Sequence, residues 1–179
     1  MSQIGSVYGQ ALYGLAKEEG ESRGILAQLQ ALEEGFSQEP GYLRLLSSPQ
    51  LPKQERTQIL DEGFRGKVHP YVLNFLKLLT ERNLAGAFPD CVREYRARYH
   101  EDNGILPVRA VTAVALTPEQ SKRLEEKLAK ITGKTIELVN RVDPECLGGV
   151  RLDYDGRRVE DTVAGRLESV RALLKNTVL

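Results

Sequence analysis

The chain has 179 residues, 41% of them hydrophobic and 28% charged, a mixture typical of one globular domain or two small ones. Its 25 basic and 25 acidic residues cancel, with 12 and 14 before Gly104 and 13 and 11 after it, so neither half has the basic surface expected of a protein that binds nucleic acid or anionic lipid. The chain lacks both an apolar run of about 18 residues and a signal-peptide pattern, and Cys91 and Cys146 lie alone and far apart, which predicts free thiols in a reducing cytoplasm and no membrane span.

The first hundred residues predict six helices and no strand. Apolar residues recur there at spacings of three and four, and glycine, proline or asparagine interrupts the pattern. The predicted helices run from 4 to 18, from a cap at Ser22 to the break at Pro40–Gly41, from 42 to 47, from Pro52 at the first helical position to 64, from 70 to 82, and from Leu84 to Tyr99. Short connections between them favour antiparallel neighbours in a compact bundle.

The most hydrophobic of these helices is Tyr71–Arg82. On a wheel of about 100° per residue its apolar side chains cover roughly 220°, whereas a surface helix needs a stripe only somewhat wider than about 100°. We therefore expect this helix to bury two sides, one against its own core and the other against further helices or a partner.

Beyond the Asp102–Gly104 loop, the pattern changes to the alternation that is typical of strands. The first strand is expected to turn Leu106, Val108, Ala110, Val114 and Leu116 to one face. Thr117 then begins a helix with Pro118 at its first position and Gln120 closing a capping box. Its apolar stripe is expected to be Leu124, Leu128 and Ile131, and Gly133 is expected to end it.

Three further strands are predicted over 135–142, 149–154 and 157–160, the last two joined by a tight hairpin at Asp155–Gly156. Ile136, Leu138 and Val142 are expected to face inward, and Thr162 to begin a last helix with Val163, Leu167, Val170 and Leu174. The predicted fold class is therefore α+β, with a six-helix bundle over 1–104 and a small β-α-β-β-β-α domain over 105–179.

The sequence contains no pattern typical of an active site, and we predict no catalytic residue, no metal ligand and no cofactor. Thr132–Thr135 looks like the end of a phosphate-binding loop, but Leu128 stands where the motif needs glycine, and helix and strand come in the wrong order. Neither His69 nor His100 has a second His or a Cys at ligand spacing in the sequence. We expect His69 to face solvent near a helix start and His100 to end a helix. Gly148–Gly149 predicts a bulge or a close backbone approach rather than a ligand cradle.

Four stretches match the motifs of one family. Tyr8–Leu12 corresponds to an opening Y-A-x-A-L/F, Asn74–Pro89 to a central segment, and Gly165–Glu168 to a closing R-G-R-L. Val142–Leu152 carries the most specific motif, D-P-x-x-x-G-G between aliphatic residues, formed by Asp143, Pro144, Gly148 and Gly149. Nearly end to end, the chain resembles the delta subunit of the F-type ATP synthase, the family to which the mitochondrial oligomycin-sensitivity-conferring protein is related.

The chain departs from the family pattern at three places. Gly9 replaces the usual alanine, which costs up to about 1 kcal/mol of helix propensity. Glu160–Thr162 stands in place of D-G-S, and Ala164 in place of arginine, which affects the entry into the last helix.

The resemblance implies a non-catalytic subunit of the peripheral stalk, or stator, of a proton-translocating ATP synthase. The helical domain would bind N-terminal helices of the alpha subunits in the catalytic head, and the second domain would bind the b subunits that rise from the membrane. This linkage would keep the head from turning with the rotor during ATP synthesis. The resemblance implies one copy in a hetero-oligomeric complex at the cytoplasmic face of a bacterial cell membrane, with no cofactor, no nucleic acid and no direct membrane insertion.

In this family an alpha-subunit helix lies in a groove between the first and fifth helices. Carried over to this chain, the groove would be lined by Tyr8, Ala11, Leu12 and Leu15 from the first helix and by Phe75, Leu78 and Leu79 from the fifth. The alternative is that all seven side chains fill the core of the bundle. The residues alone leave both interpretations open, and the resemblance favours the groove.

Two other classes of protein are compatible with the element order. An adaptor that binds nucleic acid is one, because small β-α-β-β units often bind RNA, but the balanced charge argues against it since phosphate contacts dominate such affinity. An enzyme that uses a cleft between two domains is the other, and it lacks any nucleophile–base or metal pattern.

Overall fold

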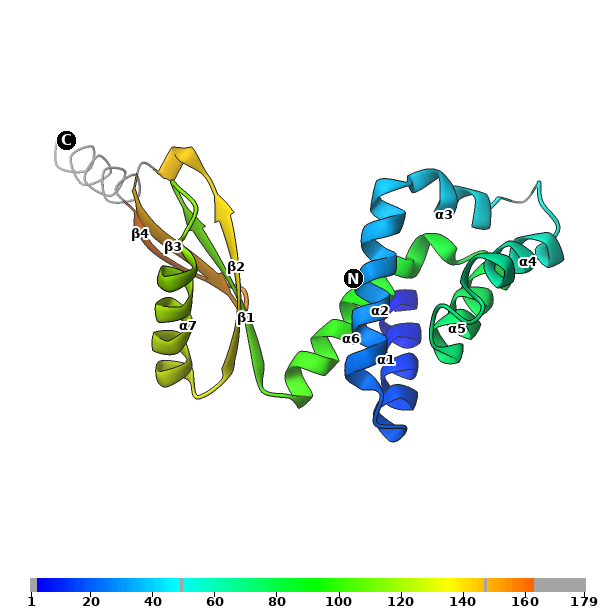
Figure 1. Cartoon of the computed structure of the whole chain (residues 1–179), viewed down its shortest axis with the longest axis horizontal. Coiled ribbons are helices and arrows are strands. Elements are labelled where there is room, and N and C mark those ends of the chain that lie inside the picture. Colours follow the sequence, from blue (N-terminus) through cyan, green and yellow to red (C-terminus); the bar gives the residue numbers. More distant parts are fainter. Residues whose placement is uncertain (1–2, 49, 147, 163–179) are drawn as a thin grey trace, which may run out of the picture. The chain divides into compact units, whose positions relative to one another are not determined.

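Figure 1 shows the computed structural model of the chain, which describes residues 3–48, 50–146 and 148–162. The chain divides into two compact units, residues 1–99 (the helical unit) and residues 100–179 (the sheet unit). The division falls inside a helix rather than in the loop at Gly104, because the end of that helix packs with the sheet. His100 is buried, and its Nε2 lies 2.8 Å from Oε2 of Glu137.

The mixed helix-and-sheet class is confirmed, and the described residues of the first half are all helix, turn or loop. The helices are α1 Gln3–Glu18, α2 Ser22–Gln38, α3 Pro40–Leu46, α4 Lys53–Phe64, α5 Pro70–Glu81, the short 3-10 helix η1 Ala85–Ala87, and α6 Phe88–Asp102. Among them α5 packs against α1, α2 and α4, and α2 also packs against α1 and α3. The arrangement of all six as one antiparallel bundle stays a prediction.

The predicted helix boundaries were wrong at three prolines or caps. Ser22 is the first residue of α2 rather than its cap, since Glu21 holds the N-cap position without a side-chain hydrogen bond. α2 ends at Gln38, as the predicted break at Pro40–Gly41 requires, but α3 begins at Pro40 rather than at Tyr42, since proline is tolerated in the first turn of a helix. Pro52 is the N-cap of α4 rather than its first residue, so this helix begins one residue later than expected, at Lys53. Asn83, at φ 57°, turns the chain as predicted, but η1 intervenes before α6.

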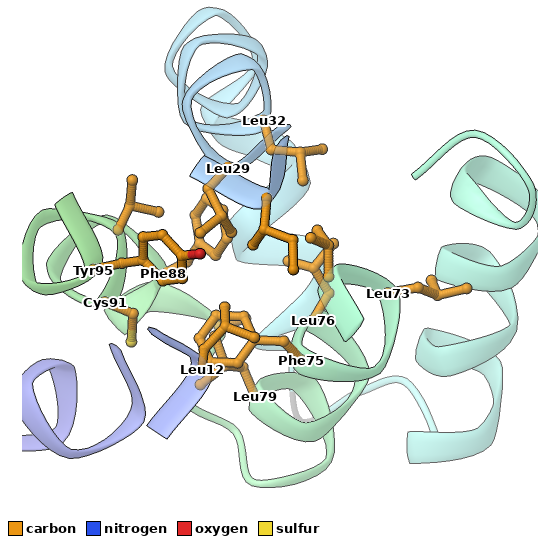
Figure 2. Close-up of a cluster of buried hydrophobic side chains, with 14 of the residues drawn as sticks. Leu12, Leu29, Leu32, Leu73, Phe75, Leu76, Leu79, Phe88, Cys91 and Tyr95 are labelled. Carbon is orange, nitrogen blue, oxygen red and sulfur yellow. The ribbon is translucent and has the colours of Figure 1, made fainter. Parts of the chain in front are cut away.

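The core of the helical unit is a continuous cluster of aliphatic and aromatic side chains from every one of these helices (Figure 2). Tyr13 meets Tyr95 edge to face at 5.2 Å between ring centroids, and Phe36 meets Phe88 in the same way at 5.3 Å. The Tyr95 hydroxyl donates a hydrogen bond of 2.9 Å to the carbonyl oxygen of Ser22, which satisfies the polar end of this buried ring.

Helices α1 and α6 approach closely through two glycines. A Cβ on Gly9 would lie 2.5 Å from the carbonyl oxygen of Cys91 and 2.8 Å from Cβ of Glu94. A Cβ on Gly5 would lie 2.6 Å from Cβ of Asp90. Real Cβ atoms essentially never come this close, so the bare backbone at these positions is what allows the two helices to touch. The departure from the family's usual alanine at Gly9 thus has a steric reason.

One buried cation ties three helix ends together. Arg56 of α4 is 2% exposed, and its Nη1 donates to the carbonyl oxygen of Leu46 at 2.9 Å, to that of Thr80 at 3.5 Å, and to Oδ1 of Asn83 at 2.9 Å. The Leu46 carbonyl belongs to the last turn of α3, where carbonyls lack partners within the helix. The Thr80 carbonyl belongs to the last turn of α5 and also accepts a hydrogen bond from the backbone of Asn83 at 3.1 Å. The guanidinium therefore caps both helices from inside the core.

The sheet unit is a four-stranded sheet in the order β2-β1-β3-β4. Its strands are β1 Ile105–Thr112, β2 Thr135–Val142, β3 Gly149–Tyr154 and β4 Arg157–Thr162, with helix α7 Pro118–Thr132 between the first two. β1 pairs with β2 in parallel and with β3 antiparallel, and β3 pairs antiparallel with β4. α7 packs along β2 and covers one face of the sheet (Figure 1).

The turn chemistry predicted for this unit is confirmed. Thr117 accepts a hydrogen bond from the backbone of Gln120, and the Gln120 side chain accepts one from the backbone of Thr117, which completes the capping box. Gly133 ends α7 with a φ of 69°. Asp155 and Gly156 have φ values of 49° and 70°, as a tight hairpin between β3 and β4 requires.

Several apolar side chains predicted to face inward are exposed. β1 ends at Thr112, so Val114 and Leu116 lie beyond the strand, and Val114 is 74% exposed. Ile131 in the last turn of α7 is 80% exposed, and Val142 at the end of β2 is 48% exposed. The predicted last helix, including the Gly165–Glu168 motif, lies outside the described residues.

An asparagine takes an inward position on β2 that the apolar pattern did not predict. Asn140 donates to the carbonyl oxygen of Ala110 at 3.0 Å and to Oγ1 of Thr112 at 2.9 Å, and it accepts a hydrogen bond from the backbone of Leu116 at 2.9 Å. This side chain therefore holds the segment that leads from β1 to α7.

Candidate functional site

An exposed apolar surface runs along α1 and α5 of the helical unit. Ile4, Val7, Ala11 and Leu15 follow one another at spacings of three and four on α1, and they are all exposed, Val7 by 60% and Leu15 by 51%. Leu78 on α5 is 39% exposed. The half-buried rings of Tyr8 and Tyr71 pack against the core from the same two helices. We call these seven residues the α1–α5 face.

The seven side chains predicted to line a partner groove divide between this face and the core. Ala11, Leu15 and Leu78 are exposed and Tyr8 is half-buried, so these four belong to the α1–α5 face. Leu12, Phe75 and Leu79 are 4%, 6% and 0% exposed, and Figure 2 shows them among the buried side chains.

Leu12, Phe75 and Leu79 therefore take core positions under the face rather than partner-facing ones. Phe75 lies 6.5 Å from Phe88 between ring centroids, which places its ring between helices. The wide apolar arc of α5 is thus satisfied mostly inside the unit, with Leu78 at its outer margin.

Two site candidates were missed at the start of α1. Ile4 and Val7 extend the exposed stripe by two turns, and the spacing of four residues from Val7 to Ala11 and from Ala11 to Leu15 was visible in the sequence. The signal was ambiguous because α1 carries apolar residues on its exposed side as well as on its buried side. Gly5, Gly9, Leu12, Tyr13 and Ala16 form its buried side, and periodicity alone does not tell which side a helix buries.

The carboxylate of Glu19 and the phenol of Tyr71 lie close together at one end of the α1–α5 face. The negative charge of Glu19, which follows α1, raises the pKa of the Tyr71 phenol above its ordinary value of 10, and desolvation and a hydrogen bond with the same carboxylate act in the same direction. The first turn of α5 therefore lies beside the end of α1. Glu18 follows Leu15 by three residues, so the apolar stripe ends in carboxylates on this side.

The D-P-x-x-x-G-G motif builds the crossing from β2 to β3 around the end of β1. The backbone N–H of Asp143 donates to the carbonyl oxygen of Thr112 at 2.8 Å, and Oδ1 of Asp143 accepts from the backbone of Glu145 at 3.1 Å. Pro144 then opens the short 3-10 helix η2 Pro144–Cys146.

The glycine pair of this motif has the backbone that its sequence position suggested. Gly148 donates to the carbonyl oxygen of Cys146 at 2.7 Å, and Gly149 begins β3 with a φ of 83°. A side chain at Gly149 would be strained at this φ. The motif thus acts through its backbone conformation and hydrogen bonds.

The described ranges hold no group of three His, Cys, Asp or Glu side chains that could bind a metal ion. Across the same ranges, no helix combines the length and the apolar character that a membrane crossing requires. Burial raises the pKa of the Cys91 thiol to about 11, so this thiol is protonated near neutral pH. His69, expected to face solvent, is half-buried at the N-cap of α5, where its Nδ1 accepts from the backbone of Tyr71 at 3.3 Å.

Comparison with known proteins places these features in one family. The family model described as "ATP synthase delta (OSCP) subunit" matches residues 4–174. The chain is 31% identical to the ATP synthase subunit delta of Desulfitobacterium hafniense over 97% of both chains, and 34% identical to that of Lactobacillus delbrueckii subsp. bulgaricus over 93% of both. Among solved structures, a chain of the Toxoplasma gondii mitochondrial ATP synthase hexamer shares the fold, with a TM-score of 0.76, 16% identity, and coverage of 97% and 98%.

Proposed function

The chain belongs to the ATP synthase delta (OSCP) subunit family, and from that premise we propose which of its surfaces join it to the rest of the complex. It is a non-catalytic subunit of the peripheral stalk of an F-type ATP synthase, which links the catalytic head to the membrane part and resists the torque of the rotor. The family gives no support to the alternative of a nucleic-acid-binding adaptor.

The helical unit binds the N-terminal helix of an alpha subunit on the α1–α5 face. An amphipathic helix recognised in this way lays apolar side chains, spaced by three and four residues, onto a complementary apolar surface. Ile4, Val7 and Leu15 offer such a stripe, and Leu78 offers a fourth contact from the neighbouring helix. The exposure of Ile4, Val7 and Leu15 in one row is the single observation that carries the proposal, since an exposed apolar patch often marks a contact site for a partner.

The energies are sufficient for a specific contact. Burying three or four such side chains contributes roughly 1.5–3 kcal/mol each. Ordering the partner helix costs about 2–5 kcal/mol, and the lost translational freedom costs more. A dissociation constant in the micromolar range follows for one isolated helix. Other contacts in the assembled stalk would raise the overall affinity by acting in parallel.

The sheet unit contacts the b subunits of the stalk. Its described residues leave apolar side chains exposed on α7, β2 and β4, and β2 is an edge strand of the sheet that these residues form. Ile131, Val139, Val142 and Val159 are each at least 48% exposed. Surfaces of this kind are rarely left uncovered in a small domain.

In this assignment the protein sits at the cytoplasmic face of a bacterial cell membrane, in one copy, and is held there by the complex. Co-purification from cells with the chain as bait tests the assignment. Recovery of alpha and b subunits with the membrane fraction supports it. Recovery of RNA, or of the chain with no other ATP synthase subunit, contradicts it.

A further inference from the structure

An apolar hollow of about 420 Å³ lies in the helical unit, lined by residues outside the α1–α5 face. Its lining includes Gly35, Phe36, Glu39, Tyr42, Gly63 and Phe64. Glu39 is the one charged side chain among the described residues that line it, and none of them is cationic. The two glycines keep the hollow open, since a Cβ on Gly35 would meet nothing within 4 Å and one on Gly63 would only touch the Tyr42 hydroxyl at 3.6 Å.

Three aromatic rings form the wall of the hollow. Phe36 and Tyr42 stack at 5.4 Å with an interplanar angle of 13°, and Phe64 meets both rings edge to face, at 6.3 Å and 6.1 Å. Burial raises the pKa of the Tyr42 phenol, so the ring stays neutral and its face keeps its partial negative charge at physiological pH. Such faces attract cations within about 6 Å of the ring centroid.

Two helix C-termini meet at the same place. α2 ends at Gln38 and α4 ends at Phe64, and neither helix carries a basic residue in its last turn. Helix C-termini bear a partial negative charge that cations normally offset. At the end of α2 the N-terminus of α3, which begins at Pro40, offsets this charge, so the end of α4 is the one that a cation would complement. Arg65, which follows α4, does not line the hollow, and its Nη2 lies 3.0 Å from Oδ1 of Asp61.

We propose that this hollow is a second partner-binding site, which takes an arginine side chain from a neighbouring polypeptide. The aliphatic stem of arginine fits an apolar wall, its planar guanidinium stacks on aromatic rings, and its charge complements Glu39 and the end of α4. The site is separate from the α1–α5 face and does not depend on which subunits occupy that face or the sheet unit. An acidic or purely apolar side chain would lack these electrostatic contributions.

The proposal is tested by titrating the full chain, labelled with ¹⁵N, with two peptides that differ in charge. Acetyl-Leu-Arg-Leu-amide should shift the backbone amide signals of Gly35 and Gly63 with a dissociation constant of about 1–10 mM, as one anchor side chain permits. Acetyl-Leu-Glu-Leu-amide should bind at least fivefold more weakly. Equal binding of the two peptides, or shifts confined to the α1–α5 face, would overturn the proposal.

Matched variants separate the charge from the shape of the site. Glu39→Gln should weaken the arginine peptide about two- to fivefold, whereas Glu55→Gln, an exposed carboxylate of α4 that does not line the hollow, should leave it unchanged. Gly35→Leu should fill the hollow and abolish the shifts, and Gly14→Leu, placed where a Cβ also meets nothing, is its control. Retained binding in Gly35→Leu would refute the site. The outcome for an alpha-subunit peptide on the α1–α5 face is read from different signals, so failure here leaves the proposed function standing.

Discussion

The close contact between α1 and α6 makes opposite predictions for two glycines of the same helix. Gly9 and Gly14 are both interior residues of α1, and each would gain helix propensity from alanine, about 0.8–1 kcal/mol. At Gly14 an added Cβ meets nothing within 4 Å. At Gly9 it would lie 2.5 Å from the carbonyl oxygen of Cys91, a backbone atom that cannot move without shifting α6.

The expected magnitudes follow from these distances. Gly14→Ala should stabilise the helical unit by about 0.5–1 kcal/mol, since only the propensity changes. In Gly9→Ala, overpacking costs about 1–3 kcal/mol and exceeds the same gain, so the variant should lose up to about 2 kcal/mol. The two single-methyl variants should therefore differ by about 1–3 kcal/mol in the free energy of unfolding.

Urea denaturation followed by helical circular dichroism measures this difference on the full chain. Gly5→Ala is a second test, since its Cβ would lie 2.6 Å from Cβ of Asp90. If Gly9→Ala proves as stable as Gly14→Ala, then α1 and α6 are not in close contact, and the steric reason given for glycine in place of the family's alanine is wrong.

Three further predictions concern the core, the motif and acid pH. Arg56→Met should cost about 1.5–3 kcal/mol in the free energy of unfolding, because it leaves the carbonyl of Leu46 without its donor and removes one of two donors from that of Thr80, while Arg44→Met on the surface should stay within about 0.5 kcal/mol; equal stabilities would contradict the capping role. Gly149→Val should strain β3 by about 1–3 kcal/mol and abolish capture of the b subunits, while helical circular dichroism is unchanged. Normal capture of the b subunits would show that this contact does not require the glycine. A hydrogen bond from Lys77, together with Arg65, lowers the pKa of Asp61 below its ordinary 3.8. The stability that the Asp61 carboxylate contributes is therefore present above pH 3.8 and is lost as the pH falls through the lower pKa of the folded state. Asp61→Asn should flatten this part of an acid denaturation curve, and an unchanged curve would show that the bonds do not persist in solution.

Local signals in the sequence were sufficient for most elements of the fold. The capping box at Thr117 and the hairpin at Asp155–Gly156 depend on side chains and backbone angles within a few residues, so their prediction needed no tertiary information. Prolines were less decisive because Pro40 and Pro52 suit more than one position near a helix start.

Burial was harder to predict wherever a residue's environment comes from distant parts of the chain. Arg56 lies between polar neighbours and reads as a surface residue, yet helix ends from α3 and α5 enclose it. Ile131 continues the apolar stripe of Leu124 and Leu128 in the sequence, yet its side chain is 80% exposed.

The candidate site shows the same limit more sharply. The apolar arcs of α1 and α5 were correctly found, but a wheel gives no absolute rotation, so it could not assign Leu12, Phe75 and Leu79 to the core and Leu15 and Leu78 to the surface. The family assignment, by contrast, was within reach because the D-P-x-x-x-G-G motif fixes a backbone turn through residue types that few alternatives satisfy.

The most direct test of the account is a titration of the full chain with a peptide that matches the N-terminal helix of an alpha subunit. Because burial of apolar surface drives this contact, binding should be micromolar and nearly independent of added salt. Leu15→Asp and Leu78→Asp should each weaken it at least tenfold while helical circular dichroism is kept, and Val139→Asp in the sheet unit should leave it unchanged. Phe75→Asp should instead unfold the helical unit, since that ring is in the core. A wild-type chain that ignores the peptide, or Leu15→Asp and Leu78→Asp variants that bind it normally, would contradict the assignment of the α1–α5 face as the attachment to the catalytic head.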